Sequence, residues 1–547
     1  MRIGLAVALA IGLAARANAQ CAMHAPSELD PGEPVLLEGL GTLHHAVTAK
    51  PAAQRWFDQG LRLVYAFNHD EAVRSFREGA RLDPSCAMCF WGVALALGPN
   101  INMPIDPARE KLAAEAVAQA QALSSQVSAP ERGYIAAIAT RYGPAEGSRA
   151  DRDSAYAAAM RTLARANPRD PDAQTLFAES LMDLRPWNLW THDGKPQPGT
   201  LEALAALRSV LKRHPDHPGA NHYLIHVLEG SPHPEQALDA AQRLPRLMPG
   251  AGHIVHMPSH IYLRLGRYAE ATAANEAAIA ADKAYLAKAH VDGAYAQMYV
   301  AHNFQFLWLT AAMEGRSAES ISAARELVAR FPVPVAAEMA KQMPGFDALL
   351  APEYFALVRF SKWEALAAEP EPASALPHLH AWWQFGRALA LAHLGKPEAA
   401  AAAQRAFDAY VAALPPDLML GPANAVRAVA EVGQAVIAGE LAGARGDVEG
   451  AVAHLERAVV FEDALNYDEP PPWPLPARER LGSELLQAHR FAEAERAFRG
   501  DLARHPENGW ALHGLAQALR AQHSKEAPAV ERRFRKAWAR ADVALPR

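Results

Sequence analysis

Large apolar residues and small residues alternate in this chain with intervals that predict paired helices. Trp56, Gly60, Ala72, Phe76 and Pro84 follow one another at intervals of four, twelve, four and eight residues. Two antiparallel helices that cross closely need small residues at the crossing, and Gly60 and Ala72 are suited to that place. We expect Phe76 to fill the gap between one helical hairpin and the next, and Pro84 to end the second helix.

The same pattern recurs along the chain. Near the C-terminus Gly482, Ala494, Phe498 and Pro506 repeat it closely. Further copies begin at Gly266, Gly315, Gly395 and Gly446, less regular hairpins fill 86–168, and a basic helix from Glu531 to Ala541 is expected to cap the stack. Strand signals are almost absent, so the pattern predicts an all-α fold.

These intervals resemble the signature of the tetratricopeptide repeat (TPR), a helix-turn-helix unit of about 34 residues. The resemblance covers most of the chain and implies an all-α, right-handed α-solenoid of TPR-type helical hairpins. The chain is also similar to uncharacterised exported bacterial TPR proteins that share the segments Phe67-Asn68-His69-Asp70-Glu71-Ala72 and His256-Met257-Pro258-Ser259-His260-Ile261-Tyr262. Neither likeness implies a reaction.

The first residues indicate export. An apolar run from Ile3 to Ala15 is followed by Ala17-Asn18-Ala19, the small-residue pattern that signal peptidase cleaves after. We therefore expect a periplasmic or secreted protein. Lipidation at Cys21 is the alternative, but Gln20 stands where lipidation requires a small residue.

Composition then divides the chain into four predicted parts. They are a signal peptide (1–19), an N-terminal extension (20–52), an N-terminal solenoid with a His-rich concave groove (53–368) and a C-terminal solenoid with its capping helix (375–547). The polar, proline-containing stretch 369–374 separates the two solenoids. Because repeats contact mainly their neighbours, this boundary is expected to be soft.

The negative net charge of the chain disfavours nucleic acid as a class of partner. The formal charge is −6, and it becomes −8 when Arg2 and Arg16 leave with the signal peptide. No large basic block accompanies this acidic balance. Beyond the signal peptide, no stretch is long enough and free enough of charge to span a membrane.

Two pairs of histidines repeat with the period of the hairpins. His222 and His226 are four residues apart, as are His256 and His260, so each pair shares one helix face. The two pairs are 34 residues apart, one full repeat, and should lie side by side on adjacent hairpins. The repeat register places them in the concave groove, where four imidazoles are expected to converge.

Further polar residues extend this stripe. Glu229 lies one turn beyond His226, His253 one turn before His256, and His302 takes the position of His253 in the following repeat; Glu179 aligns with His226 one repeat earlier, with Asp183 one turn further along. Imidazole and carboxylate are ligands of Cu and Zn, and also of Fe and Mn.

The first hypothesis is therefore a solenoid that binds a transition metal, Cu or Zn before Fe or Mn. The four paired histidines would be the ligands, with His253, His302 and Glu229 as extra ligands. Glu179, Asp183 and Glu229 are the candidate catalytic groups if the site performs chemistry. Whether the protein is an enzyme stays open, because no nucleophile elbow, phosphate-binding loop, dinucleotide fingerprint or His-Glu-x-x-His motif is present.

The second hypothesis is a periplasmic adaptor. In this case the concave groove binds an extended peptide or a partner protein, and the stripe of histidine and carboxylate serves specificity.

A second candidate site is a pair of cysteines. Cys86 and Cys89 form a Cys-x-x-Cys pair at a junction between predicted hairpins. In an exported protein such a pair is a small disulfide loop, a redox pair or half of a soft-metal site. We expect the disulfide first. Three cysteines in all allow at most one intramolecular bridge, so apolar burial must hold the fold.

Overall fold

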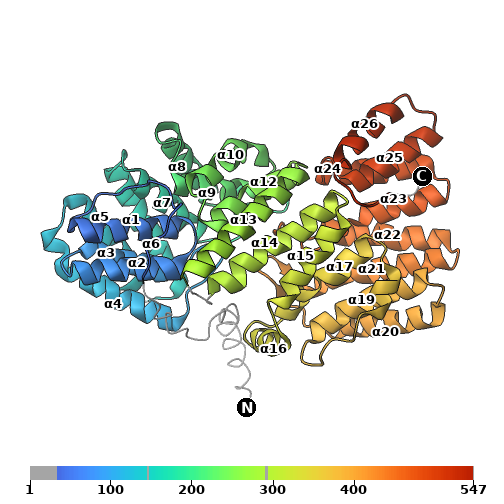
Figure 1. The fold of residues 1–547 in the computed structure, drawn as a ribbon, viewed down its shortest axis with the longest axis horizontal. Coiled ribbons are helices and arrows are strands. Elements are labelled where there is room, and N and C mark those ends of the chain that lie inside the picture. The colour runs from blue at the N-terminus through green and yellow to red at the C-terminus, as the bar shows by residue number, and fades with distance from the viewer. Residues whose placement is uncertain (1–33, 144–146, 290–293, 546–547) are drawn as a thin grey trace, which may run out of the picture.

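The computed structural model describes residues 34–143, 147–289 and 294–545, and this part of the chain is built of helical hairpins (Figure 1). Its β structure amounts to β1 (Met419–Leu420) paired antiparallel with β2 (Asn424–Ala425), and two isolated bridges. The predicted all-α solenoid is confirmed. The expected signal peptide and Cys21 lie outside the described residues. No described helix combines the length and apolarity needed to cross a bilayer.

The helices follow one another as antiparallel pairs. The first half contains α1 (Pro51–Tyr65), α2 (His69–Leu82), α3 (Ala87–Leu97), α4 (Pro107–Leu123), α5 (Ala129–Tyr142), α6 (Arg149–Ala166), α7 (Pro171–Met182), α8 (Thr200–Arg213), α9 (Pro218–Glu229), α10 (Leu238–Leu247), α11 (Gly252–His256), α12 (Pro258–Arg264) and α13 (Tyr268–Ala289). The second half contains α14 (Ala294–Met313), α15 (Ser317–Ala329), α16 (Val333–Gln342), α17 (Pro352–Arg359), α18 (Trp363–Ala368), α19 (Pro377–His393), α20 (Pro397–Ala413), α21 (Val426–Ala444), α22 (Val448–Asp463), α23 (Ala477–Gln487), α24 (Phe491–Arg504), α25 (Gly509–Ala521) and α26 (Ala527–Ala537). Short 3₁₀ turns are η1 (Ser124–Gln126), η2 (Pro234–Ala237) and η3 (Phe346–Leu350).

One phenyl ring locks the first hairpins together, as the sequence pattern predicts. A Cβ added to Gly60 would lie 2.6 Å from Phe76 Cε1, and one added to Gly92 on α3 would lie 2.4 Å from Phe76 Cδ1. The ring therefore occupies the space that these two glycines leave. Near the C-terminus Phe498 lies against Gly482 in the same manner, with 2.6 Å to an added Cβ.

The turns inside the hairpins use the left-handed backbone region. Gly266, Gly315, Gly395 and Gly446 end the first helix of their hairpins with φ between 66° and 77°. Glycine is the usual residue at such a C-terminal turn because it lacks a Cβ. In the first hairpin this place is taken by Phe67, with φ of 55°.

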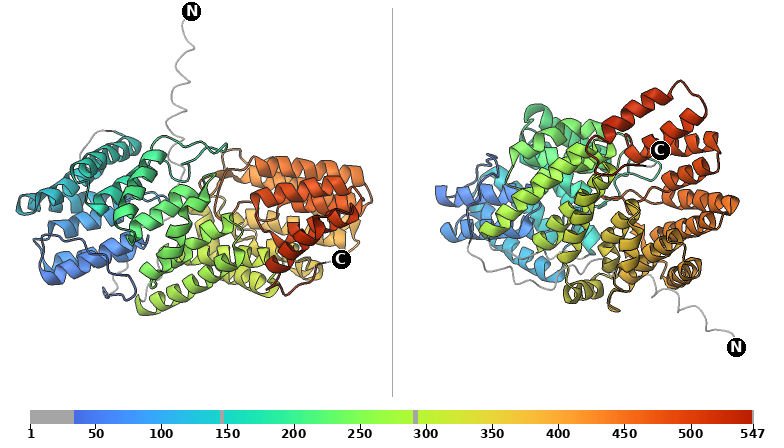
Figure 2. Two further views of the ribbon diagram at one scale, coloured as in Figure 1. Left: turned by 90° about the horizontal axis from the view of Figure 1, so that it is seen from above. Right: turned by 45° about the vertical axis from the view of Figure 1, so that its right-hand side comes forward.

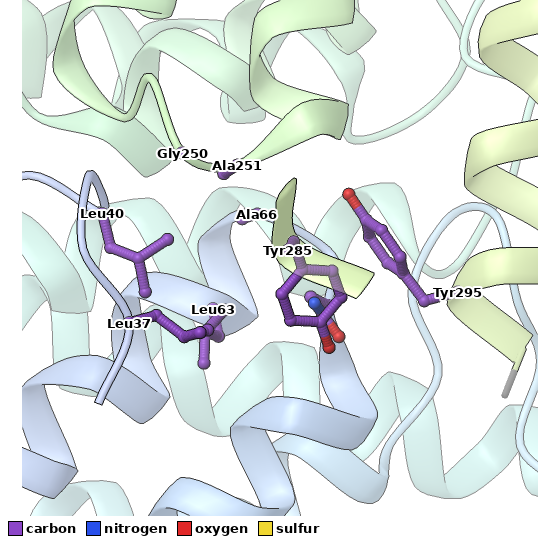
Figure 3. Close-up of a pocket in the computed structure, with 9 residues that line it drawn as sticks. Leu37, Leu40, Leu63, Ala66, Gly250, Ala251, Tyr285 and Tyr295 are labelled. Atoms are coloured by element: carbon purple, nitrogen blue, oxygen red, sulfur yellow. The ribbon is translucent and has the colours of Figure 1, made fainter. Parts of the chain in front are cut away.

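The first half curls until its first hairpin meets later repeats. Tyr285 on α13 donates a hydrogen bond of 3.1 Å to Glu71 on α2, across 214 residues of sequence. The segment before α1 follows the same seam, where Gly250 donates to the carbonyl of Gly39 at 2.8 Å. In Figure 3, Leu40 of this segment lies below the turn at Gly250. The concave side of this half is thereby filled by α1 and α2.

The second half also returns to the middle of the chain. Trp510 donates to the carbonyl of Ala312 at 3.0 Å, and Asp542 accepts from the backbone of Ser317 at 2.7 Å. The predicted boundary at 369–374 is an irregular stretch between α18 and α19, but α17 and α18 both pack on α19 and one apolar core runs across it. This stretch lies inside the second half. The two halves, α1–α13 and α14–α26, form two abutting arms (Figures 1 and 2).

Candidate metal centre

The structure sorts the histidines of the inner face into two groups of three. His222 and His226 on α9 meet His253 on α11, and ligand atoms of all three lie within 4.8 Å of one another. We call this group the first triplet. His256 on α11 and His260 on α12 meet His302 on α14 in the same way, and we call this the second triplet.

The two pairs therefore lie on adjacent hairpins, as the 34-residue interval predicts, but each converges with a third histidine. The second triplet repeats the arrangement of the first triplet, displaced by one hairpin. In each triplet a histidine from the next helical segment joins the pair: His253 joins His222 and His226, and His302 joins His256 and His260. The triplets are close neighbours: the ring centroids of His226 and His260 are 6.0 Å apart, and those of His253 and His256 are 5.9 Å apart.

Fixed acceptors face the Nδ1 atoms of two of the three histidines in the first triplet. His222 Nδ1 lies 2.7 Å from the carbonyl oxygen of Tyr65, which can only accept, so this nitrogen carries the proton. His226 Nδ1 lies 2.9 Å from Glu229 Oε1. His253 Nδ1 has no partner among the described residues.

The second triplet has the same arrangement. His260 Nδ1 lies 2.7 Å from Glu229 Oε2, and His256 Nδ1 lies 2.7 Å from Asn275 Oδ1. The amide of Asn275 donates to the carbonyl of Ala271 at 2.8 Å, which orients its oxygen toward His256. His302 Nδ1 is 3.3 Å from an amide oxygen of Gln305. In the five rings whose Nδ1 faces an acceptor, Nε2 is the nitrogen left to bind a metal ion, as it is in many metal-binding histidines. His253 is the exception.

The Nε2 atoms face one another across short gaps. His222 Nε2 lies 3.0 Å from that of His226 and 3.1 Å from that of His253, and the Nε2 atoms of His256 and His260 are 2.8 Å apart. With protons on Nδ1, these atoms present lone pairs that repel one another. A proton between two rings would relieve one contact, but His222 Nε2 faces two other nitrogens.

A metal ion fits this spacing. Two nitrogens bound at 2.0–2.1 Å in tetrahedral geometry lie about 3.3 Å apart. The gaps in both triplets are within about half an ångström of that value, which small rotamer changes accommodate.

One carboxylate connects the two triplets. Glu229 accepts from His226 with one oxygen and faces His260 with the other, so a single side chain orients one ring in each group. Burial alone would raise the pKa of Glu229, but the facing imidazoles of His226 and His260 lower it to about 2. Glu229, expected from the sequence to be an extra ligand or a base, has both its oxygens against ring nitrogens.

The imidazoles are held in the form that binds metal. Burial, together with the charge of neighbouring histidines, lowers the pKa of His222, His253 and His256 well below 6.5, and that of His302 to about 3. Neutral imidazole is the ligand form, and a protonated ring cannot bind.

Each triplet has its own aromatic cover. Phe67 stacks on His226 and His253 at centroid distances of 5.6 and 5.4 Å. Phe306 packs on His260 at 4.6 Å and on the other two rings of its triplet at 4.8 and 5.0 Å. Exposure of the paired histidines and His253 is 0–4%. The expected open concave groove is therefore filled here, because the first hairpin folds over it.

Glu179 and Asp183 lie in a different buried group. Asp183 Oδ2 accepts from Arg141 at 2.8 Å, and Arg141 also binds Asp153 at 2.7 Å. Burial raises the pKa of Glu179 well above its usual range, and the neighbouring Asp183 adds to the rise. Within the described ranges no hydrogen bond or ion pair joins either carboxyl to a triplet. The structure does not bring these two candidates to the histidines.

The two cysteines meet as the sequence predicts. Cys86 and Cys89 are joined by a disulfide at the start of α3. Because the two sulfurs are bonded to each other, they do not offer thiolate ligands to a soft metal.

Several residues of the centre carry no signal in the sequence. Tyr65, Phe67, Asn275 and Phe306 come from other hairpins or from turns, and each is an ordinary core or turn residue by its pattern. Phe67 stands where four later hairpins have glycine, at Gly266, Gly315, Gly395 and Gly446.

Comparisons with known proteins leave the family open. No family model matches the chain, and no curated protein matches it. Among solved structures, the human IFIT1 dimer with m7Gppp-AAAA is 13% identical with a TM-score of 0.32, over 90% of this chain and 92% of that one. Yeast Tom70 is 12% identical with a TM-score of 0.29, over 88% and 92%. The TPR domain of P58(IPK) is 11% identical with a TM-score of 0.21, over 86% and 98%. Likenesses this distant carry no argument about function.

Proposed function

We propose that this chain is an exported helical-repeat protein that binds two transition-metal ions, one in each histidine triplet. The observation that carries the proposal is the close approach of Nε2 atoms, at 3.0 and 3.1 Å in the first triplet and at 2.8 Å between His256 and His260 in the second. His302 has a ligand atom within 4.8 Å of those of His256 and His260. Imidazole ligands without thiolate favour copper or zinc, with iron as a further candidate.

Three protein ligands leave a coordination position open. A metal ion held in this way supplies Lewis acidity, and for copper or iron also redox chemistry. The protein contributes the carboxylate of Glu229, which keeps one ring of each triplet in place, and the phenyl covers, which exclude water.

Peptide binding is a second candidate function, but at another place. The triplets are too deeply buried to meet a peptide. A cavity of about 1050 Å³ lies between the two arms and is lined by residues of both. A scaffold function would use this cavity.

Export is supported by the disulfide between Cys86 and Cys89, since such bonds persist in oxidising compartments. Localisation is testable by fractionating cells that express the full chain.

Thermal unfolding with and without metal tests the proposed function. Chelator-treated protein should gain stability when Zn²⁺ or Cu²⁺ is added, by about 2.7 kcal/mol for each triplet at a free concentration a hundred times its dissociation constant. The double variant His222→Ala/His256→Ala should lose this gain. His454→Ala, which removes an exposed histidine on α22, is the matched control and should keep it. An equal gain in the double variant would refute binding at the triplets.

A further inference from the structure

The cavity between the arms is built from chemically distinct walls. One wall is the turn after α7 with Trp187 and Trp190, and the opposite wall is the proline-rich loop before α23 with Tyr467 and Glu469. Trp187 also lies edge-on to the ring of His226 at 6.3 Å, so the cavity borders the first triplet. Its volume is in the range of small-molecule sites.

Three acids in this cavity lack a basic partner. Glu462, Asp468 and Glu469 line it, and among the described residues none has a lysine, arginine or histidine at ion-pair distance. The side chain of Glu469 is the clearest case, because the residue is 6% exposed and its Oε2 atom has no hydrogen-bond partner. Its Oε1 atom accepts from the hydroxyl of Tyr467. A buried carboxyl oxygen without a partner needs a ligand or a proton.

Of the four basic residues that line the cavity, three are already engaged, and the fourth is His192. Arg504 pairs with Asp463 at 3.1 Å, and His505 pairs with Asp501 at 2.9 Å. Arg264 donates to the backbone carbonyls of Glu229 and Ser231 at 2.9 and 3.1 Å. Arg264 has no carboxylate at ion-pair distance among the described residues, and the three acids outnumber it.

We propose that this cavity binds a small organic cation with primary ammonium groups, held by Glu469 and Asp468 and flanked by the aromatic walls. An ammonium group supplies the donors that the unpartnered carboxyl oxygen lacks. Half-buried Trp187 and Trp190 add ring faces, which attract cations electrostatically. The inference goes beyond the proposed function and does not depend on metal in the triplets.

Burial raises the pKa of Asp468 to about 7 and that of Glu469 well above its usual range. Both carboxyls are thus costly to ionise while the cavity holds no cation.

Three probes test this proposal, each with four methylene groups between its two end groups. Putrescine carries two ammonium groups, N,N′-diacetylputrescine is its neutral analogue, and adipate carries two carboxylates. Binding is measured by calorimetry on chelator-treated protein at low ionic strength, so that amine coordination to metal cannot contribute. Putrescine should bind at least about tenfold more tightly than either analogue, and the affinity should fall with added salt.

Variants locate the site. Glu469→Gln and Asp468→Asn keep side-chain volume and should each weaken putrescine binding about tenfold or more. Glu371→Gln changes an exposed carboxylate outside the cavity and is the matched control, with unchanged affinity expected. Equal binding of the neutral analogue, tighter binding of adipate, or no putrescine binding at millimolar concentration would overturn the inference. Each of these results leaves the metal content of the triplets unaffected, so the two proposals fail separately.

Discussion

At the scale of single residues, Glu229 has the most consequential position in the molecule. Its two oxygens face one ring in each triplet, at 2.9 and 2.7 Å. A carboxylate can accept from both rings at once, whereas an amide has one accepting oxygen. The arrangement therefore requires a carboxylate and not merely a polar side chain.

The substitution Glu229→Gln tests this requirement. The new amide nitrogen would face an N–H group of one of the two rings, so at least one triplet loses its orientation. Loss of such a partner weakens metal binding about 10- to 100-fold. Competition with a chelator of known affinity measures the change, and Glu371→Gln, on the surface, serves as the control. Unchanged affinity would show that Glu229 does not orient the rings.

Phe67 is a second residue whose side chain has a clear role at the first triplet. A phenylalanine in the left-handed region costs backbone energy that glycine does not. The ring is nevertheless kept where it stacks on His226 and His253. The ring covers two of the three imidazoles of the first triplet.

Replacing Phe67 with glycine should relieve strain and still destabilise the protein. Loss of a buried phenyl ring costs about 3–5 kcal/mol, of which the relieved strain returns about 1 kcal/mol. Chelators should also remove metal faster from the variant. His489→Gly is the matched control, since exposed His489 has φ of 58° at an equivalent turn and should tolerate glycine without loss. Chemical denaturation and the rate of metal release are the measurements.

At the scale of elements, the segment before α1 is pinned by a buried carboxylate. Asp172 on α7 accepts from His45 at 2.7 Å, from Tyr65 at 2.7 Å and from His217 at 3.1 Å. The carbonyl of Tyr65 in turn holds His222. The segment is therefore connected to the first triplet through two residues. The cluster of His45, Asp170 and Asp172 also has metal-ligand spacing, but these bonds already occupy Asp172.

This attachment should weaken in alkaline solution. Burial alone would lower the pKa of His45, but Asp172, with help from Asp170 and Asp58, raises it above 6.5. Its contribution to stability is complete below about pH 6.5 and is lost as the pH rises through the raised value. The pKa of Asp172 is lowered, so its own contribution is lost only in acid.

Hydrogen exchange measures this loss. Amides of residues 34–48 should exchange faster at pH 9 than at pH 6, after correction for intrinsic rates. The change should disappear in His45→Gln and persist in His454→Gln. A pH-independent protection of this segment in the unaltered protein would contradict the role of His45.

The helix period predicted which histidines lie side by side, but it did not predict that they form two separate sites. Four-residue and 34-residue intervals correctly placed two pairs on adjacent hairpins. The third histidine of each triplet was harder to assign, because His253 and His302 are 49 residues apart and not 34. The long helices α13 and α14 account for the difference.

At the scale of the whole molecule, curvature could not be predicted from the sequence. The hairpins and their stacking follow from local spacing, as Gly60 and Phe76 illustrate. The closure of each arm is the sum of small rotations between repeats, which no single residue encodes. It brings Tyr65 to His222 across 157 residues and converts an expected open groove into a buried centre.

The number of metal ions per chain tests the central claim most directly. Protein purified from the exported fraction, or reconstituted with Zn²⁺ or Cu²⁺ and desalted, is analysed for metal and protein together. The unaltered chain should contain two ions, His222→Ala and His256→Ala one each, the double variant none, and the control His454→Ala two. A chain that retains no metal, or one ion that either single variant abolishes, would contradict two separate triplet sites.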